Sequence, residues 1–269
     1  MKRKTDKNAS VKTSGAVSEP KKKRLLYKEY VRKTSVTIAL IAGVVIVGVV
    51  ALFAILIVVM NTSNLKTAAV EYDYLRGLAG DIAGDTNEPG GIQLSALDLE
   101  MRGINPDYVC WIRVNGTNID YPVVRGGDNE KYIKTSFYGE SNIAGAVFMD
   151  YRNIGDPIPH IIIYGHNLQQ GGMFTDLRKF LNPRFLEENR IITLIVNGNE
   201  VEFEIFSARL SDTDDPAYDL DLSVPRQFAR FADKINAPLI ATQILTLSTC
   251  ASGGTDNARV IVQGYRLYN

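Results

Sequence analysis

The sequence predicts a mostly β domain, either a barrel or a sandwich, that follows one membrane-spanning helix and two short helices. Two observations lead to this prediction. Residues 38–60 read IALIAGVVIVGVVALFAILIVVM, with nothing more polar than glycine. Eight short runs rich in β-branched and aromatic residues, bounded by Gly, Pro, Asn or Asp, then lie between residues 109 and 267. A chain of 269 residues is long enough for one domain of ~150 to 200 residues plus accessory segments.

The first segment, residues 1–33, is a basic tail. It holds 12 Lys and Arg against 3 Asp and Glu, whereas the rest of the chain holds 18 against 27. The acidic remainder excludes broad binding to a phosphate backbone, so nucleic acid is not an expected partner. The tail is polar and rich in Lys, Ser and Thr, and we expect it to be disordered.

Residues 34–60 are predicted to be a transmembrane signal anchor. As a helix, the apolar stretch 38–60 is about 35 Å long, enough to cross a hydrocarbon core of ~30 Å. A buried core helix is disfavoured because the stretch has no polar face. A cleaved signal peptide is disfavoured because its apolar region would be ~7 to 15 residues long and end at a small-x-small site, whereas this one ends VVMNTSN.

The flanking charges predict the topology. Lys and Arg lie only on the N-terminal side of the span, so the positive-inside rule places residues 1–33 in the cytoplasm. We therefore expect a single-pass protein of the cell membrane with residues 61–269 outside the cell.

Residues 61–103 are predicted to form a helical stalk and N-terminal helices. A first helix over 65–78 (LKTAAVEYDYLRGL) has no breaker until Gly77. The turn-rich stretch GDIAGDTNEPGG predicts a loop, and a second helix is expected over 95–102.

The main domain is expected over residues 104–269. Three helices are predicted between its strands, at 129–134, 173–181 and 225–235, the last with a proline in its first turn. The eight strands are expected at 109–114, 118–124, 145–149, 160–164, 191–196, 201–210, 243–247 and 260–267.

Two cysteines fall in the part expected outside the cell, where an even count usually suggests a disulfide. The surrounding residues argue against one. Cys110 lies in the apolar stretch YVCWIRV, where we expect it to pack as a small hydrophobe. Cys250 ends a β-rich run and begins a Gly- and Ser-rich loop, the kind of place where catalytic groups are found.

A catalytic partner for Cys250 must come from two histidines, His160 and His166, which share the segment PHIIIYGHN. His166 is the preferred one because it follows the strand, where a turn presents its ring to a groove. Arg259 lies nine residues after Cys250, and a loop of that length can return the chain beside the cysteine. A thiolate is a nucleophile, an imidazolium can protonate a leaving amine, and a guanidinium can hold an oxyanion.

These motifs resemble a known family. TLSTC, the upstream YGHN and the downstream arginine resemble the sortase signature, and WIRVNGTNIDYPVV with GAVFMDYRN is similar to the class B sortases of Gram-positive bacteria. The likeness covers residues 94–267. It implies an eight-stranded sortase-type β-barrel with N-terminal helices and a helical insertion before the penultimate strand, to which residues 212–236 correspond.

The resemblance also implies an activity, that of a cysteine transpeptidase with no cofactor and no metal. Cys250 would be the nucleophile, His166 the proton donor and acceptor, and Arg259 the clamp on the oxyanion. The substrate would be a secreted protein with a C-terminal sorting signal, cut in a short Pro-containing motif and transferred to an amine of a peptidoglycan precursor. Tyr164, Ser248 and Thr249 fall along the family's substrate groove, although packing roles are equally open for them.

Two other functions stay open at this point. One is a sortase that polymerises pilins, in which a pilin lysine replaces the peptidoglycan amine. The other is a membrane-anchored binding protein whose barrel has no activity.

The acidic run over residues 212–221 could suggest a calcium site. It contains Asp212, Asp214, Asp215, Asp219 and Asp221, but it lacks the glycine and the closing glutamate of a calcium loop. We expect these side chains to be solvated on the approach to a helix, and no metal site is predicted.

Overall fold

The structure is a computed structural model that describes the backbone of residues 19–84, 90–155, 157–168, 170–222, 224–250 and 257–268. Within these ranges, the side chains of residues 83, 84, 90–95 and 250 lie outside the description. The chain divides into two compact units, Met1–Val59 and Met60–Asn269.

The first unit contains most of one long helix, α1 (Glu19–Gly84). Among the described residues it is the one helix that is apolar and long enough to cross a membrane, with a mean hydropathy of 3.2 over its most apolar window. The prediction of a disordered tail covers residues 1–33. Residues 1–18 lie outside the described residues, and the prediction is wrong from Glu19 onward, where the chain is helical. Ion pairs one helical turn apart, such as Lys33 with Glu29, favour the helix there.

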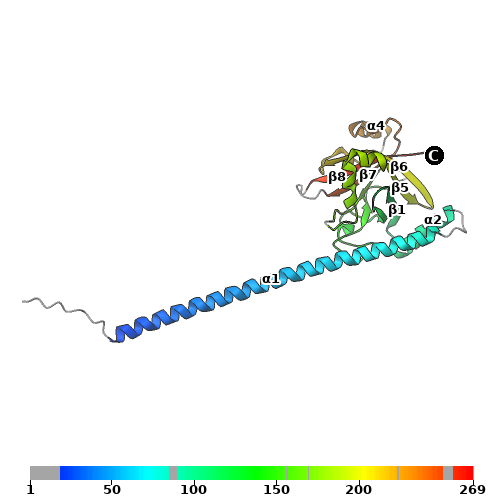
Figure 1. Ribbon diagram of the computed structural model, residues 1–269. Helices are drawn as coiled ribbons and strands as arrows, with labels where there is room; N and C mark the ends of the chain where they lie inside the picture. The colour runs from blue at the N-terminus through cyan, green and yellow to red at the C-terminus, as the bar shows by residue number, and fades with distance from the viewer. Residues whose placement is uncertain are drawn as a thin grey trace, which may run out of the picture. The chain divides into compact units, whose positions relative to one another are not determined.

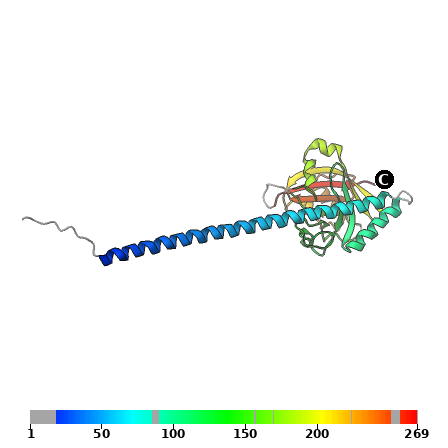
Figure 2. The same cartoon turned by 60° about the horizontal axis from the view of Figure 1, so that its bottom comes forward.

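In the second unit, the last turns of α1 pack against the main domain. One face of the helix is buried, at a spacing of three or four residues: Ala68, Tyr72, Leu75 and Ala79. The helix therefore continues through Gly77 and Gly80, although each glycine costs about 1 kcal/mol relative to alanine. Both helices extend into the stretch predicted as a loop, because α1 ends at Gly84 and α2 (Gly90–Ile104) begins before residue 95. Helix α2 lies beside the end of α1 (Figure 2).

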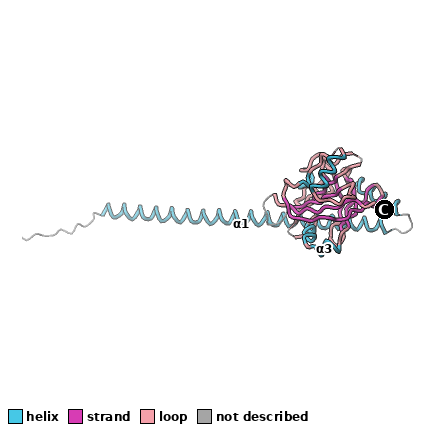
Figure 3. The backbone as a smooth tube through the Cα atoms, turned by 90° about the horizontal axis from the view of Figure 1, so that it is seen from above, coloured by secondary structure: helices cyan, strands magenta, loops and turns pink. Residues whose placement is uncertain are grey.

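Eight strands close into a barrel in the order β1-β2-β3-β4-β7-β8-β6-β5. Figures 1 and 3 show the strands gathered together with the helices outside them. The predicted β fold is confirmed as a barrel. The strands are β1 (Tyr108–Val114), β2 (Asp120–Val124), β3 (Val147–Met149), β4 (His160–Tyr164), β5 (Ile191–Val196), β6 (Asn199–Ser211), β7 (Ile244–Cys250) and β8 (Arg259–Arg266).

Two of the strand pairs are parallel, β2 with β3 and β4 with β7, and the others are antiparallel. In the β4/β7 pair Tyr164 is opposite Ser248, and in the β7/β8 pair Cys250 is opposite Arg259. The ends of β4 and β7 and the start of β8 therefore meet at one edge of the barrel.

The two faces of the β4-β7-β8-β6 region are both covered. Alternate residues such as Leu245, Leu247 and Val262 belong to the main core inside the barrel. The outer face is covered by the segment between β6 and β7, which contains helix α4 (Pro225–Lys234). There Phe231 and Ile235 pack with Ile244 in a second apolar cluster. The predicted helical insertion before the penultimate strand is confirmed.

The remaining helices are short. The predicted helices at 129–134 and 173–181 are 3-10 helices, η1 (Lys131–Ile133) and η2 (Thr175–Leu181). Two others were not predicted: α3 (Pro183–Glu188), capped by the Asn182 side chain, and the 3-10 helix η3 (Pro216–Tyr218).

Candidate active site

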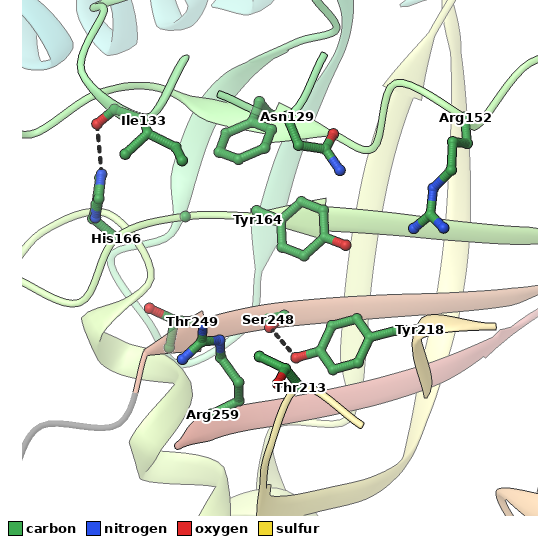
Figure 4. A pocket seen from close by; sticks show the side chains of 12 residues that line it. Asn129, Ile133, Arg152, Tyr164, His166, Thr213, Tyr218, Ser248, Thr249 and Arg259 are labelled. Atoms are coloured by element: carbon green, nitrogen blue, oxygen red, sulfur yellow. Dashed lines mark hydrogen bonds between the residues drawn. The ribbon is translucent and has the colours of Figure 1, made fainter. Parts of the chain in front are cut away.

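The edge of the barrel at which β4, β7 and β8 meet borders a pocket with a volume of ≈ 550 Å³. Figure 4 shows side chains from several elements converging on it. Five of the six side chains singled out in the sequence line this pocket, and the sixth, that of Cys250, lies outside the description. The lining residues are Asn129, Ile133, Phe148, Arg152, Tyr164, Gly165, His166, Thr213, Tyr218, Ser248, Thr249 and Arg259.

His166 is held by the turn that follows β4. A Cβ atom on Gly165 would lie 2.6 Å from the ring of the buried Phe174, so only glycine fits before the histidine. The carbonyl of His166 accepts the backbone N–H of Phe174 at 2.9 Å. On the pocket side, its Nε2 donates to the carbonyl of Ile133 at 2.7 Å, which fixes the ring and leaves Nδ1 as the acceptor in the neutral form.

Cys250 is the last residue of β7, and its backbone pairs with that of Arg259, the first residue of β8. The sequence placed Cys250 at the border of strand and loop, and the strand reaches three residues further than predicted. Arg259 is half-buried, lines the pocket, and donates from Nη1 to the carbonyl of Ala258 at 3.0 Å. The expected neighbourhood of Cys250 and Arg259 is thus present in the strand register.

Ser248 and Thr249 precede the cysteine and differ in their surroundings. The hydroxyl of Ser248 lies 2.7 Å from that of Tyr218, which comes from the segment between β6 and β7. Thr249 is 2 % exposed, and its Oγ1 has no hydrogen-bond partner among the described residues. A buried hydroxyl without a partner costs free energy, which a ligand accepting or donating a hydrogen bond there would recover.

Asp150 organises the wall of the pocket opposite β8. Its fully buried carboxylate accepts hydrogen bonds from Tyr164 Oη at 2.9 Å, from Asn129 Nδ2 at 3.0 Å, and from Arg152 Nη2 at 2.8 Å. Burial alone raises the pKa of Asp150, but these hydrogen bonds outweigh it and hold the pKa below its ordinary value. One carboxylate therefore orients three side chains of the pocket.

Sequence reasoning missed several lining residues. Asn129, Arg152, Thr213 and Tyr218 were not singled out, because no local pattern marks them. A signal was available for Arg152, which lies in GAVFMDYRN, one of the segments that resemble class B sortases. The ring of Tyr218 is nearly parallel to that of Tyr164, with centroids 6.4 Å apart.

The other cysteine, Cys110, is a free thiol 1 % exposed in strand β1. Burial, followed by the nearby charge of Asp98, raises the pKa of this thiol far above its ordinary value. The expectation of a packed, unpaired Cys110 is confirmed, and a thiol in this state is a poor nucleophile at neutral pH.

The other histidine, His160, faces the outer layer and does not line the pocket. It is 1 % exposed, its Nδ1–H donates to the carbonyl of Asp219 at 2.9 Å, and its Nε2 accepts from the Thr246 hydroxyl at 2.8 Å. Its ring also packs on that of Phe231, with centroids 4.5 Å apart. Burial lowers the pKa of His160 from its ordinary 6.5 to about 4, so the ring is neutral at physiological pH.

Because His160 is buried and neutral, we expect the folded protein to be less stable toward unfolding in acid. Between about pH 6.5 and pH 4 the unfolded chain binds a proton at His160 and the folded chain does not, so the free energy of unfolding decreases as the pH falls. The loss reaches about 3 kcal/mol at pH 4. Urea unfolding of the full chain in detergent micelles at pH 4 to 7 measures it, with His160→Gln as the variant expected to lack this part of the dependence. An NMR titration contradicts the assignment if the His160 ring titrates near 6.5.

The acidic run over 212–221 is only partly solvated, contrary to expectation. Asp212 and Asp214 are exposed, and Asp219 forms an ion pair with Lys234. Asp215, however, has a side chain that is 7 % exposed and forms an ion pair with Arg209 at 2.6 Å. The prediction of a solvated side chain is wrong for Asp215.

Comparisons with known proteins agree on one family. The sortase domain model matches residues 112–267. Sortase B of Listeria monocytogenes is 31 % identical over 193 residues, which cover 68 % of this chain and 78 % of that protein. Sortase B of Staphylococcus aureus is 32 % identical over 169 residues, covering 59 % of this chain and 69 % of that protein.

Solved structures give the same answer. A mutant form of Clostridium perfringens sortase B has a TM-score of 0.66 and 30 % identity, covering 74 % of this chain and 97 % of that one. A substrate complex of S. aureus sortase B has a TM-score of 0.65 and 27 % identity, covering 75 % of this chain and 97 % of that one. With the closed eight-stranded barrel and the pocket at the end of β4 and β7, these matches show that the chain belongs to the sortase family of cysteine transpeptidases, in class B.

Proposed function

We propose that this transpeptidase is anchored in the cell membrane, cuts a C-terminal sorting motif of secreted proteins, and transfers them to an amine of a peptidoglycan precursor. The observation that carries this proposal is the strand register, in which β4 and β7 are parallel and Cys250 is opposite Arg259. It supports a site made of Cys250, His166 and Arg259, which three separate segments supply.

In the proposed reaction the Cys250 thiolate attacks the carbonyl carbon of the scissile peptide bond. The negative charge that develops on the carbonyl oxygen is stabilised by the Arg259 guanidinium. The C–N bond then breaks, and the leaving amine takes a proton from His166. This leaves a thioacyl bond between the substrate and Cys250.

The second half of the reaction reverses the proton transfers. The acceptor amine attacks the thioacyl carbon and gives a proton to His166, a new amide forms, and the Cys250 thiolate leaves. The hydrogen bond from His166 Nε2 to the carbonyl of Ile133 supports this role, because it leaves Nδ1 of the neutral ring free to accept that proton.

We assign substrate contacts to Tyr164, Ser248 and Thr249. The support for Thr249 is its buried hydroxyl, which has no partner among the described residues and borders the pocket. The aromatic walls formed by Tyr164 and Tyr218 are suited to an extended, Pro-containing peptide, since aromatic grooves accept such segments with little loss of entropy.

Membrane anchoring is supported by α1 and by the basic residues that precede its apolar part. In this proposal residues 1–33 are cytoplasmic, residues 34–60 cross the membrane, residues 61–103 form the stalk and N-terminal helices, and residues 104–269 form the catalytic domain outside the cell.

Cleavage of sorting peptides by the full chain in detergent micelles tests the function. The panel contains LPxTG, NPxTN and SPxTG types, each assayed with and without an amine acceptor, and Cys250→Ala is the matched variant. We expect cleavage of one type, a shift to an amide product when the amine is present, and no turnover by Cys250→Ala.

Thiol labelling distinguishes the ways in which this assay can fail. Because Cys110 is buried, we expect iodoacetamide to label Cys250 and not Cys110 in the folded protein. A folded protein that cleaves no peptide and whose Cys250 is unreactive contradicts the proposed activity and favours a binding protein. Isopeptide-linked oligomers formed from added pilin subunits favour a pilin-polymerising sortase instead.

A further inference from the structure

The segment between β6 and β7 forms one wall of the pocket through Thr213 and Tyr218. Tyr218 ends the 3-10 helix η3, its ring is nearly parallel to that of Tyr164, and its hydroxyl meets that of Ser248. Ser248 lies two residues before Cys250. The position of Tyr218 therefore sets the width of the pocket beside the end of β7.

Asp215 anchors this segment on one side of Tyr218. Its Oδ1 accepts the backbone N–H of Ala217 at 2.8 Å, which caps η3. The same carboxylate binds Arg209 of β6 in a two-bonded pair, from Nη2 at 2.6 Å and from Nε at 3.0 Å. A planar guanidinium held this way fixes the direction as well as the distance of its partner.

The segment is anchored on the other side of Tyr218 through the backbone of Asp219. The carbonyl of Asp219 accepts the Nδ1–H of His160 at 2.9 Å. The neutral His160 ring accepts in turn from the Thr246 hydroxyl at 2.8 Å. His160 and Thr246 are both strand residues, and each is 1 % exposed or less.

One continuous row of hydrogen bonds joins the two anchors across the outer face of the barrel. Gln263 Nε2 donates to Thr246 Oγ1 at 3.0 Å, and Gln263 Oε1 accepts from Arg209 Nη1 at 2.7 Å. We call this row the polar belt, and its members in order are Asp219 (carbonyl), His160, Thr246, Gln263, Arg209 and Asp215.

We infer that the polar belt, and above all the pair of Asp215 with Arg209, positions Tyr218 for the sorting peptide and thereby determines the affinity of the enzyme for its substrate. Asp215 and Arg209 do not reach the reacting atoms and act through Tyr218 as positioning residues. The inference about affinity rests on the proposed function. The anchoring of residues 212–222 by the belt stands without it.

Hydrogen exchange tests the anchoring without any need for turnover. In the full chain in micelles, Asp215→Asn is expected to speed amide exchange over residues 212–222 by about tenfold, equal to ~1.4 kcal/mol of lost protection, and to leave the barrel strands unchanged. The matched control is Glu204→Gln, which removes a carboxylate of β6 that pairs with Arg190 and Tyr265 away from the pocket. Unchanged exchange over 212–222 in Asp215→Asn overturns the inference.

Kinetics test the consequence for the substrate. Asp215→Asn is expected to raise KM for a cleaved sorting peptide about tenfold, equal to ~1.4 kcal/mol of lost binding, with kcat and the rate of Cys250 alkylation close to wild type. In a Tyr218→Ala background the same change is expected to have no further effect on KM, because the two residues act in series. A KM of Asp215→Asn equal to that of wild type, or effects of the two changes that simply add, overturns the inference.

Asp215→Asn leaves the Arg209 guanidinium without its anion, and this variant could fail to fold for that reason. A second variant keeps the test decisive in that case. The double change Arg209→Gln with Asp215→Asn removes both charges and keeps amide groups that can still hydrogen-bond, and it is expected to give the same rise in KM. If the wild-type protein cleaves no peptide at all, the proposed function fails, and hydrogen exchange still decides whether the belt anchors the segment.

Discussion

Replacing His166 by glutamine is expected to lower the turnover of a cleaved sorting peptide by about 10²- to 10⁴-fold, the usual contribution of a general acid and base. Glutamine is a suitable replacement because its amide N–H can still donate to the carbonyl of Ile133, as the Nε2 of His166 does at 2.7 Å. The pocket keeps its shape, and what is lost is the proton that the leaving amine requires.

Two measurements check this prediction. The first is kcat for the variant and for wild type on the same peptide. The second is the dependence of rate on pH, which should be bell-shaped for wild type, because the reaction needs a thiolate and an imidazolium together. The variant should lose one side of that profile. Turnover within threefold of wild type, or a flat wild-type profile across neutral pH, contradicts the role of His166.

The second large effect is expected for Arg259→Lys, which should lower kcat by about 10²- to 10³-fold, as the loss of an oxyanion donor does in other acyl-transfer enzymes. Arg259 is half-buried at the edge of the pocket, and its backbone pairs with that of Cys250. Lysine keeps the positive charge but lacks the planar, forked donor geometry. The variant therefore separates the contribution of the forked guanidinium geometry from that of the positive charge.

Single-turnover kinetics with the cleaved peptide measure the acylation step directly in this variant. Arg190→Lys is the control, since Arg190 is an exposed arginine that pairs with the carboxylate of Glu204 and lies outside the pocket. We expect wild-type rates from the control. Near wild-type acylation by Arg259→Lys removes Arg259 from the catalytic site.

Features that depend on neighbouring residues were predictable from the sequence. The apolar stretch within α1, the eight strands and the insertion with α4 each follow from a local pattern of residue types. The same holds for the candidate site, because His166 follows a strand and a glycine, and Cys250 ends a β-rich run.

What escaped prediction depends on contacts between distant segments. The carbonyl of Ile133, in a 3-10 helix, accepts a hydrogen bond from His166, which lies 33 positions later in the chain. The Asp150 carboxylate accepts one from Asn129, which lies 21 positions earlier. The pair of Asp215 with Arg209 spans only six residues, but it depends on the chain folding back onto β6 after Ser211, and no pattern of residue types in the run over 212–221 indicates this. Backbone carbonyls and single buried pairs leave no periodic signal, so sequence patterns do not reveal them.

The parallel pairing of β4 with β7 has a consequence for how the protein matures. His160 and Thr246, one contact in this pair, are 86 positions apart in the chain, so closing the contact carries a large loop entropy and belongs to the slow, non-local part of folding. Until it closes, His166 and Cys250 are separate groups on a disordered polymer, and the cysteine is an ordinary thiol. The reactivity proposed for His166 and Cys250 therefore arises only when the barrel is complete, and an unfolded chain is not expected to attack its own peptide bonds or those of its neighbours.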